Sequence, residues 1–310
     1  MRDVVGSDIL VGSVSELVSE IRSEVIGVVS DFLKAFLNGK THVLATYTGS
    51  YSSPAIYLTL SLRTLSKTSS ALFNAQELMY YIAPYDEGRE AAVIIFNSPD
   101  GLGELSMLID QLRCTGHEYA IVTPIKLPRI VYERVRKEHV VEVGEEGFWL
   151  LRVFIAIGEA VSKHLQRRGV RAERLWRELA SLEPVVKDLV SCYKGVIEKV
   201  MQFLTMPSIV TATPTMWAVA EHLVYSRGIK PVRILARPST VRNFTRFINR
   251  VLIISTDVEE YSLKEIKGLA VTAATAIEEL KVRTDPLTAP IYGLILSRII
   301  ERYSEIAYRS

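Results

Sequence analysis

Two stretches of the chain alternate short apolar segments with amphipathic helical segments, and this alternation constrains the fold more than any other feature. In the first stretch the apolar runs are His42–Tyr47, Ser70–Asn74, Ala91–Phe96, Tyr119–Thr123 and Val140–Val143. The third run, AAVIIF, is apolar at every position, which is typical of a strand buried on both faces. Short buried strands separated by helices predict a parallel sheet with helices on both sides.

The second stretch repeats this plan after a long helical region. Its predicted strands are Ser208–Thr213, Val232–Ala236, Val251–Ser255 and Leu269–Ala273. Helical patterns separate them, a short segment follows near Leu280–Val282, and a helix at Thr288–Tyr308 closes the chain. The similar plan of the two halves indicates an internal duplication. The predicted fold class is therefore α/β, with two tandem flavodoxin-like domains, each a doubly wound parallel sheet flanked by helices.

The same patterns set the predicted domain boundaries. We expect an N-terminal helix within 1–40, a first α/β domain at 41–145, connecting helices at 146–206 and a second α/β domain at 207–310. The helix Asp8–Leu37 has one long apolar face, and the helical layer Gly147–Thr205 adds more apolar surface than two small sheets can cover. This excess predicts a homodimer.

Composition narrows the classes of function. The 37 Lys and Arg residues nearly balance the 35 Asp and Glu residues, so net charge gives no case for binding nucleic acid. No apolar run approaches the roughly 20 residues that cross a bilayer, and the N-terminus does not resemble a signal peptide. Cys114 and Cys192 lie far apart, as free thiols of a reducing compartment would, so we expect a cytoplasmic protein with no membrane partner. Scarce Asn and Gln hint at a thermophile.

No metal or cofactor site is predicted. The chain lacks the glycine patterns of dinucleotide and P-loop sites. Its histidines show no metal-ligand spacing and are expected to be structural: His42, His117, His139, His164 and His222.

The loops after the first and third predicted strands carry the candidate binding residues. In an open α/β sheet, ligands bind at the carboxyl ends of the strands, where loops lead into helix N-termini. The first loop offers glycine for close approach and hydroxyls as donors, and its residues are Thr48, Gly49, Ser50, Ser52 and Ser53. A helix cap with a hydroxyl-rich turn is the alternative interpretation.

The loop after the third strand has the same position but weaker chemistry. It contains Asn97, Ser98, Asp100 and Gly101. Because the Asp100 carboxylate would repel a phosphate, an ordinary turn is the alternative here.

These loops resemble those of the sugar isomerase (SIS) domain family. The segment TGSYSS is similar to the family's first loop, where a Gly-Thr-Ser-Tyr or Gly-Gly-Ser-Gly segment holds the sugar phosphate, and Ser50 falls on the family's serine. The stretch from NAQELMYYIAP to YAIVTP follows the family's course through its Ser-X-Ser-Gly-X-Thr loop into the next strand. The segment Thr123–Arg129 is similar to a Pro…Pro-Arg segment of archaeal phosphoglucose/phosphomannose isomerases.

The end of the chain carries the resemblance further. LTAPIYGLILSRIIERYSEIAYR is similar to the last helix of the isomerase half of glucosamine-6-phosphate synthase. The resemblance spans roughly residues 40–310 and rests on the order and spacing of several partial matches. In the Ser-X-Ser-Gly-X-Thr loop, however, Phe96, Pro99 and Gly101 replace family residues, and Ser98 alone is plainly retained.

The second half departs from the family at its catalytic positions. Counted along the chain, the positions of the family's catalytic Glu and ring-opening His fall on Arg227 and Arg242. Aldose–ketose isomerisation needs a carboxylate to move a proton, and an arginine stays protonated. A shifted alignment would give the role to Glu221 and His222, for which a solvated helix edge is the alternative.

The resemblance implies a sugar-phosphate isomerase-like protein that binds a phosphorylated hexose or amino sugar without a cofactor. If the protein is an isomerase, the resemblance implies that Arg129 stabilises the negative charge of the enediolate intermediate and that Glu221 and His222 transfer the proton. The substrate-binding residues would be Thr48, Gly49, Ser50, Ser52, Ser53, Asn97, Ser98, Gly101, Arg227 and Arg242.

Two other functions are alternatives to this one, and the sequence favours the first over the second. One is a non-catalytic sugar-phosphate-binding or regulatory SIS protein that has lost the base, which the arginines at the catalytic positions favour. Two guanidinium groups facing one site would prefer a more acidic ligand. The other, a DNA-binding regulator, is disfavoured because no helix-turn-helix pair precedes the first domain.

Overall fold

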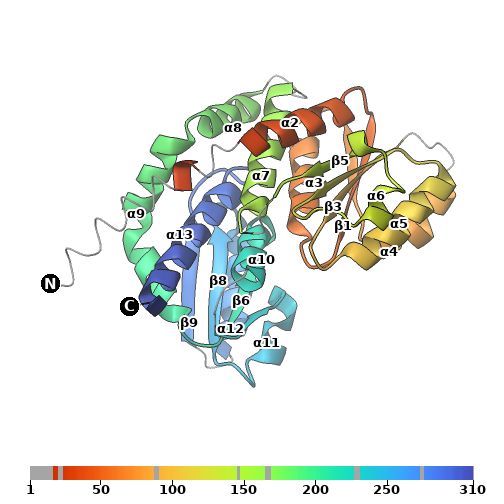
Figure 1. Cartoon of the computed structure of the whole chain (residues 1–310). Helices are drawn as coiled ribbons and strands as arrows, with labels where there is room; N and C mark the ends of the chain where they lie inside the picture. Colours follow the sequence, from red (N-terminus) through yellow and green to blue (C-terminus); the bar gives the residue numbers. More distant parts are fainter. Residues whose placement is uncertain are drawn as a thin grey trace. The chain divides into compact units, whose positions relative to one another are not determined.

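The structure is a computed structural model of the chain, and it describes residues 17–19, 24–86, 91–144, 147–164, 169–226, 231–272 and 276–309. It divides into two compact units (Figure 1). The first unit comprises Arg22–Ala180, and the second comprises Ser181–Ser310 with the described residues 17–19. Each unit contains its own parallel sheet, so the predicted α/β fold with two sheets is confirmed.

The first unit contains a five-stranded sheet in the order β2-β1-β3-β4-β5. The strands are β1 His42–Thr48, β2 Ser69–Leu72, β3 Ala92–Asn97, β4 Tyr119–Thr123 and β5 Val140–Glu142. All pair in parallel, and β3 is buried at every position, as its apolar sequence predicts. The chain passes from β1 to β2 on one side and then crosses to β3 on the other. The strand order therefore reverses between β1 and β3.

Helices cover both faces of this sheet (Figure 1). On one face lie α4 Ala75–Glu77, the π-helical segment η1 Leu78–Ile82, α5 Leu102–Thr115 and α6 Arg129–Tyr132. On the other face lie α3 Ser53–Leu65 and α7 Trp149–Glu159, and α2 Glu24–Leu37 packs against α7. The remaining elements are η2 Ala83–Tyr85, η3 Lys137–His139, η4 Ala160–His164 and α8 Val170–Ala180.

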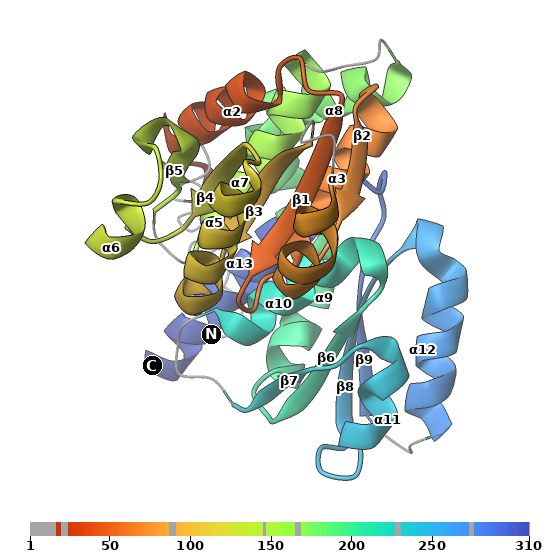
Figure 2. The same cartoon turned by 90° about the vertical axis from the view of Figure 1, so that its right-hand side faces the viewer.

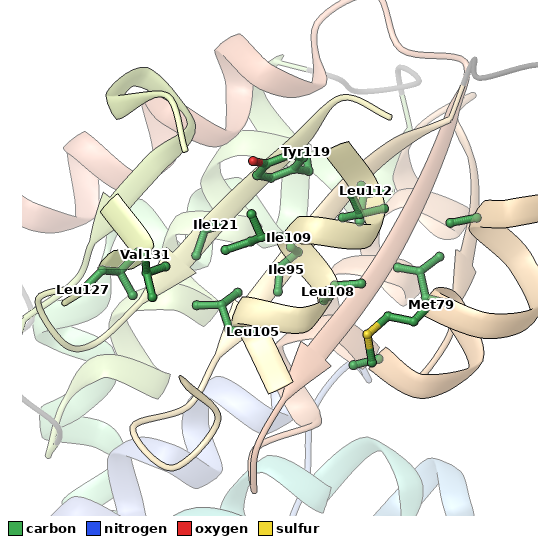
Figure 3. Close-up of a cluster of buried hydrophobic side chains, with 14 residues drawn as sticks. Met79, Ile95, Leu105, Leu108, Ile109, Leu112, Tyr119, Ile121, Leu127 and Val131 are labelled. Atoms are coloured by element: carbon green, nitrogen blue, oxygen red, sulfur yellow. The ribbon is translucent and has the colours of Figure 1, made fainter. Parts of the chain in front are cut away.

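A cluster of aliphatic side chains joins α5 to the sheet (Figure 3). Alternate residues of β3, Val93 and Ile95, turn toward Leu105 and Leu108 of α5, and all four are fully buried. Burying one side chain of this kind stabilises the fold by about 1.5–3 kcal/mol. The cluster therefore fixes α5, whose first turn borders the loop after β3.

The second unit contains a four-stranded parallel sheet in the order β7-β6-β8-β9. The strands are β6 Ser208–Ala212, β7 Arg233–Leu235, β8 Arg250–Thr256 and β9 Ala276–Val282. In Figure 2, α11 and α12 lie on one side of this sheet, and α9, α10 and α13 lie on the other. The order matches β2-β1-β3-β4, so the duplication predicted from the sequence is present in the topology.

The helical elements described in the second unit range from 3 to 22 residues in length. They are α9 Leu182–Phe203, η5 Pro214–Met216, α10 Trp217–Tyr225, η6 Pro238–Thr240, α11 Val241–Phe244, η7 Asp257–Glu259, α12 Glu260–Thr272 and α13 Ala289–Arg309. No helix among the described residues is long and apolar enough to cross a membrane.

Two local predictions are wrong. Leu269–Ala273 was expected to be a strand, but α12 continues to Thr272, because Leu263, Ile266 and Ala270 bury one helical face against the sheet. The strand is β9, which the sequence indicated only near Leu280–Val282. The sequence also predicts a helix at Pro128–Lys137 with proline in its first turn, but the helix observed there is α6, which ends at Tyr132.

The predicted helix Asp8–Leu37 is observed where the chain is described. It is helical at residues 17–19 and again from Glu24 to Leu37 in α2. The rest of that prediction lies outside the described residues.

Two helical glycines of the second unit should respond oppositely to alanine. A Cβ on Gly293 of α13 would lie 2.5 Å from Val219 Cγ2 and 2.6 Å from Met216 Cε. Val219 belongs to α10, and Met216 directly precedes that helix. Gly293→Ala should therefore lower the free energy of unfolding by about 1–3 kcal/mol. A Cβ on Gly268 of α12 would meet nothing within 4 Å, so Gly268→Ala should raise it by about 0.5–1 kcal/mol.

Urea denaturation followed by circular dichroism measures both changes. An unchanged midpoint for Gly293→Ala, or a lower one for Gly268→Ala, would contradict the observed helix packing.

Candidate functional site

The candidate site lies at the carboxyl ends of β1 and β3. Open parallel sheets bind ligands where the strand order reverses, because the two loops there diverge and leave room between them. In the first unit these loops are 49–52 after β1 and 98–101 after β3. The parallel register pairs Thr48 with Asn97, so the two loops start at the same height.

A chain of buried hydrogen bonds ties the ends of three strands together. Thr48 Oγ1 donates to Asn97 Oδ1 at 2.9 Å, and Asn97 Nδ2 donates to Thr123 Oγ1 at 3.0 Å. All three side chains are fully buried. Two of the predicted binding residues, Thr48 and Asn97, thus support the floor of the site from within.

Three consecutive backbone N–H groups of the first loop point to the second loop and to the start of α5. Gly49 N donates to Glu104 Oε2 at 3.1 Å, Ser50 N donates to Asp100 Oδ1 at 3.2 Å, and Tyr51 N donates to Ser98 Oγ at 3.0 Å. Gly49 has a φ of +79°, the left-handed conformation that lets successive N–H groups face one concavity. Such a concavity recognises oxyanions. We call these three N–H groups the cradle.

The carboxylate of Asp100 binds one N–H group of the cradle and the hydroxyl beside it. Besides accepting from Ser50 N, it accepts a hydrogen bond from Ser50 Oγ through its other oxygen. Asp100 is exposed and Glu104 is half-buried. A carboxylate of the chain itself therefore sits where the sequence predicts the phosphate of a ligand.

Two glycines permit this close approach. A Cβ on Gly49 would lie 2.6 Å from Asp100 Oδ1, and a Cβ on Gly101 would lie 2.5 Å from both Thr48 C and Thr48 O. The backbone of the second loop therefore rests directly on the end of β1. Gly101, predicted to bind the substrate, keeps the two loops together instead of offering a donor side chain.

The two remaining serines of the first loop lie at the start of α3. Ser52 occupies the N-cap position without a side-chain cap, and Ser53 is the first residue of the helix and is buried. Glu104 was not singled out from the sequence. Its signal is the DGLGE segment, an acidic residue in the first turn of a helix that follows a strand end.

The second unit repeats the arrangement. Its order reverses between β6 and β8, and Thr215 N in the loop after β6 donates to Glu259 Oε1 at 2.9 Å in the segment after β8. Thr211 Oγ1 and Thr213 Oγ1 at the end of β6 are buried and have no hydrogen-bond partner within the described part of the chain. Both units thus use an acidic residue of one loop to hold the N–H of the other.

The structure places the proposed base and its neighbour in the interior of the second unit. Glu221 and His222 on α10 are buried, so the interpretation as a solvated helix edge is wrong. His222 Nε2 lies 3.0 Å from Glu301 Oε2, and Arg298 donates to the same oxygen at 2.8 Å. Ser226 Oγ donates to the other Glu301 oxygen. The His222 ring is therefore held in a buried ion-pair network.

The arginines assigned to catalysis and substrate binding lie on the surface where they are described. Arg129 is 92% exposed at the start of α6 and pairs with Glu133 Oε1 at 2.7 Å. Arg242 is exposed on α11, and Arg227 lies outside the described residues. No cluster of three or more potential metal ligands occurs among the described residues.

The contact between the loops should depend on Gly101 and not on its near neighbour Gly103. Gly101→Ala would press a methyl group on the Thr48 backbone and should cost about 1–3 kcal/mol of unfolding free energy. Hydrogen exchange at the Gly49, Ser50 and Tyr51 amides should accelerate because their acceptors move away. A Cβ on Gly103 would meet nothing within 4 Å, so Gly103→Ala is the matched control. Equal protection of these amides in both variants would contradict the contact.

The sequence matches no protein-family profile and no curated protein. The structure is nevertheless similar to several solved structures. One is the glucosamine-6-phosphate deaminase of Thermotoga maritima, with a TM-score of 0.58 and 12% identity over 92% of this chain and 95% of that one. Another is the C-terminal domain of the glucosamine-fructose-6-phosphate aminotransferase of Francisella tularensis, with a TM-score of 0.57 and 11% identity over 94% and 95%.

A third is the tagatose-6-phosphate ketose/aldose isomerase of Escherichia coli, with a TM-score of 0.50 and 10% identity over 91% of this chain and 87% of that one. All three likenesses extend over nearly the whole of both chains. The chain therefore has the two-sheet fold of the SIS phosphosugar proteins, as its loops indicated.

Proposed function

We propose that the protein binds a phosphorylated hexose or amino sugar at the cradle of the first unit and does not isomerise it. The observation that carries this proposal is the carboxylate of Asp100 on Ser50. It supports the proposal because the N–H and hydroxyl of Ser50 already donate to a pair of carboxylate oxygens. A phosphate group presents a similar pair.

A ligand can displace Asp100 at modest cost. The side chain is exposed, so it can turn into solvent without leaving a buried charge. Each hydrogen bond from Ser50 to the Asp100 carboxylate contributes about 1.5–3 kcal/mol of free energy. Equivalent hydrogen bonds from Ser50 to the phosphate would replace them. In this mechanism Asp100 lowers the affinity for every anion and selects ligands that have further contacts.

The absence of a placed base argues against isomerisation. Proton transfer between C1 and C2 needs a carboxylate or imidazole within reach of the sugar. Among the assigned residues, Glu221 and His222 are buried within the second unit, and His222 is held by Glu301. Arg129 and Arg242 cannot accept a proton. The printed names of the similar structures mention glucosamine 6-phosphate and fructose 6-phosphate, which supports a hexose or amino-sugar phosphate as the ligand. The predicted homodimer and cytoplasmic location stay predictions.

Removing the Asp100 carboxylate should tighten phosphosugar binding. Asp100→Ala frees the Ser50 N–H and hydroxyl and removes a like charge, so the dissociation constant for glucosamine 6-phosphate should fall about tenfold. The free protein should lose about 1.5–3 kcal/mol of stability or more, because the loops lose the two hydrogen bonds that Ser50 donates to Asp100. Isothermal titration calorimetry in a phosphate-free buffer measures the first change, and thermal unfolding measures the second.

Asp31→Ala is the matched control, since Asp31 is an exposed carboxylate on α2 of the same unit. Its variant loses the same charge and should bind as the original protein does. Weaker or unchanged binding by Asp100→Ala would show that the cradle is not the phosphate site.

Proton exchange at C2 should be absent. Glucose 6-phosphate and mannose 6-phosphate incubated with the protein in D₂O should keep their C2 protons, and fructose 6-phosphate should keep its C1 protons, as NMR can follow directly. Rapid labelling at C2 would establish an isomerase instead. Asp100→Asn and Glu221→Gln would then identify which carboxylate serves as the base.

A further inference from the structure

A polar pocket of about 630 Å³ lies at the opposite edge of the first sheet, where β4 begins. Its walls come from the end of α5, the start of β4 and the segment that follows α6. The five residues of β4 separate it from the carboxyl edge of the sheet by roughly 15 Å at the usual rise of a strand. The pocket is therefore distinct from the cradle.

The acidic side chains that line the pocket already have cationic partners. Glu118 Oε2 pairs with Lys40 Nζ at 2.5 Å, and Glu133 Oε1 pairs with Arg129 Nε at 2.7 Å. One of the arginines in the wall, Arg134, is likewise paired, with Asp110 Oδ2 at 2.7 Å. Both carboxylates among the described lining residues are therefore already paired.

Two more arginines line the pocket, and these have no such partner. The guanidinium groups of Arg113 and Arg136 make no hydrogen bond or ion pair with any residue that the structure describes. Arg113 lies in the last turn of α5, where the helix dipole favours a cation. That explanation does not extend to Arg136, which lies in the segment between α6 and η3.

Both guanidinium groups lie near the phenol of Tyr119 at the pocket floor. Burial raises the pKa of Tyr119, while Arg113 and Arg136 act to lower it and Asp110 to raise it. Tyr119 lies at one end of the aliphatic cluster (Figure 3), and its hydroxyl donates to Arg134 O at 3.3 Å. The His139 ring packs edge-on against Tyr119, with ring centroids 6.3 Å apart. The two unpaired arginines therefore converge on one aromatic floor.

Two like charges that face one pocket repel each other, and an anion between them removes that cost. The planar fork of arginine matches the oxygens of a phosphate. The volume exceeds what a bare phosphate needs and falls in the range of small-molecule sites. We propose that this pocket binds a small organic phosphate, with Arg113 and Arg136 holding the phosphate group.

The test is a titration of the full chain with inorganic phosphate and with ribose 5-phosphate, followed by NMR of the arginine Nε–Hε signals and by calorimetry. Saturable shifts of the Arg113 and Arg136 signals are expected, and ribose 5-phosphate should bind more tightly than inorganic phosphate. Arg113→Ala and Arg136→Ala should each weaken binding about tenfold or more, the scale of one hydrogen bond between charged groups.

Two control variants test whether the loss of binding is specific to these two arginines and to their guanidinium groups. Arg171→Ala removes an exposed arginine from α8 of the same unit and should leave binding unchanged. Arg136→Lys keeps the charge but loses the fork and should bind with intermediate affinity. The proposal is overturned by absent binding, by equal loss in Arg171→Ala, or by shifts confined to the Gly49 and Ser50 amides, which would assign the anion to the cradle.

Discussion

The parallel pairing of β1 with β3 determines where the polar groups of the first unit lie. These strands are neighbours in the sheet but not in the sequence, so the chain leaves them in opposite directions and opens the sheet edge between their loops. The register of Thr48 with Asn97 brings the loop ends to one level. The buried hydrogen bonds from Thr48 to Asn97 and from Asn97 to Thr123 then hold the ends of three strands in this alignment. The cradle is a consequence of this alignment.

The loops at such an edge have backbone N–H groups without a secondary-structure partner, and these groups need an acceptor. Both units supply one from within the chain, Asp100 and Glu104 in the first and Glu259 in the second. An internal carboxylate keeps the unliganded loop ordered, and any anionic ligand must compete with it. The same contact therefore stabilises the fold and limits the affinity of the site.

The sequence predicts the sheets well because apolar runs such as AVIIF leave few alternatives. It fails at β9, where Glu278, Glu279 and Lys281 interrupt the apolar pattern. The Glu279 carboxylate is satisfied by Ser255 and Lys267, contacts that only the assembled sheet creates. The burial of Glu221 and His222 was missed for a similar reason: their partner Glu301 lies on α13, far along the chain. The position of the candidate loops was predictable from strand order. Which carboxylate fills the cradle was not, because it depends on the approach of Gly101 to Thr48.

The two proposed anion sites differ in how they recognise charge, and this difference follows from where they lie on the sheet. The cradle uses backbone N–H groups, whose positions are set by Gly49 and by the strand register, so its selectivity is geometric. The pocket at the start of β4 uses long side chains that carry full charges and can adjust to the ligand. Screening by salt weakens contacts between exposed charges more than it weakens fixed hydrogen bonds. A net charge of +2 for the whole chain conceals this division. Acidic groups accept from the loops at one edge of the first sheet, and the guanidinium groups of Arg113 and Arg136 have no partner among the described residues at the other.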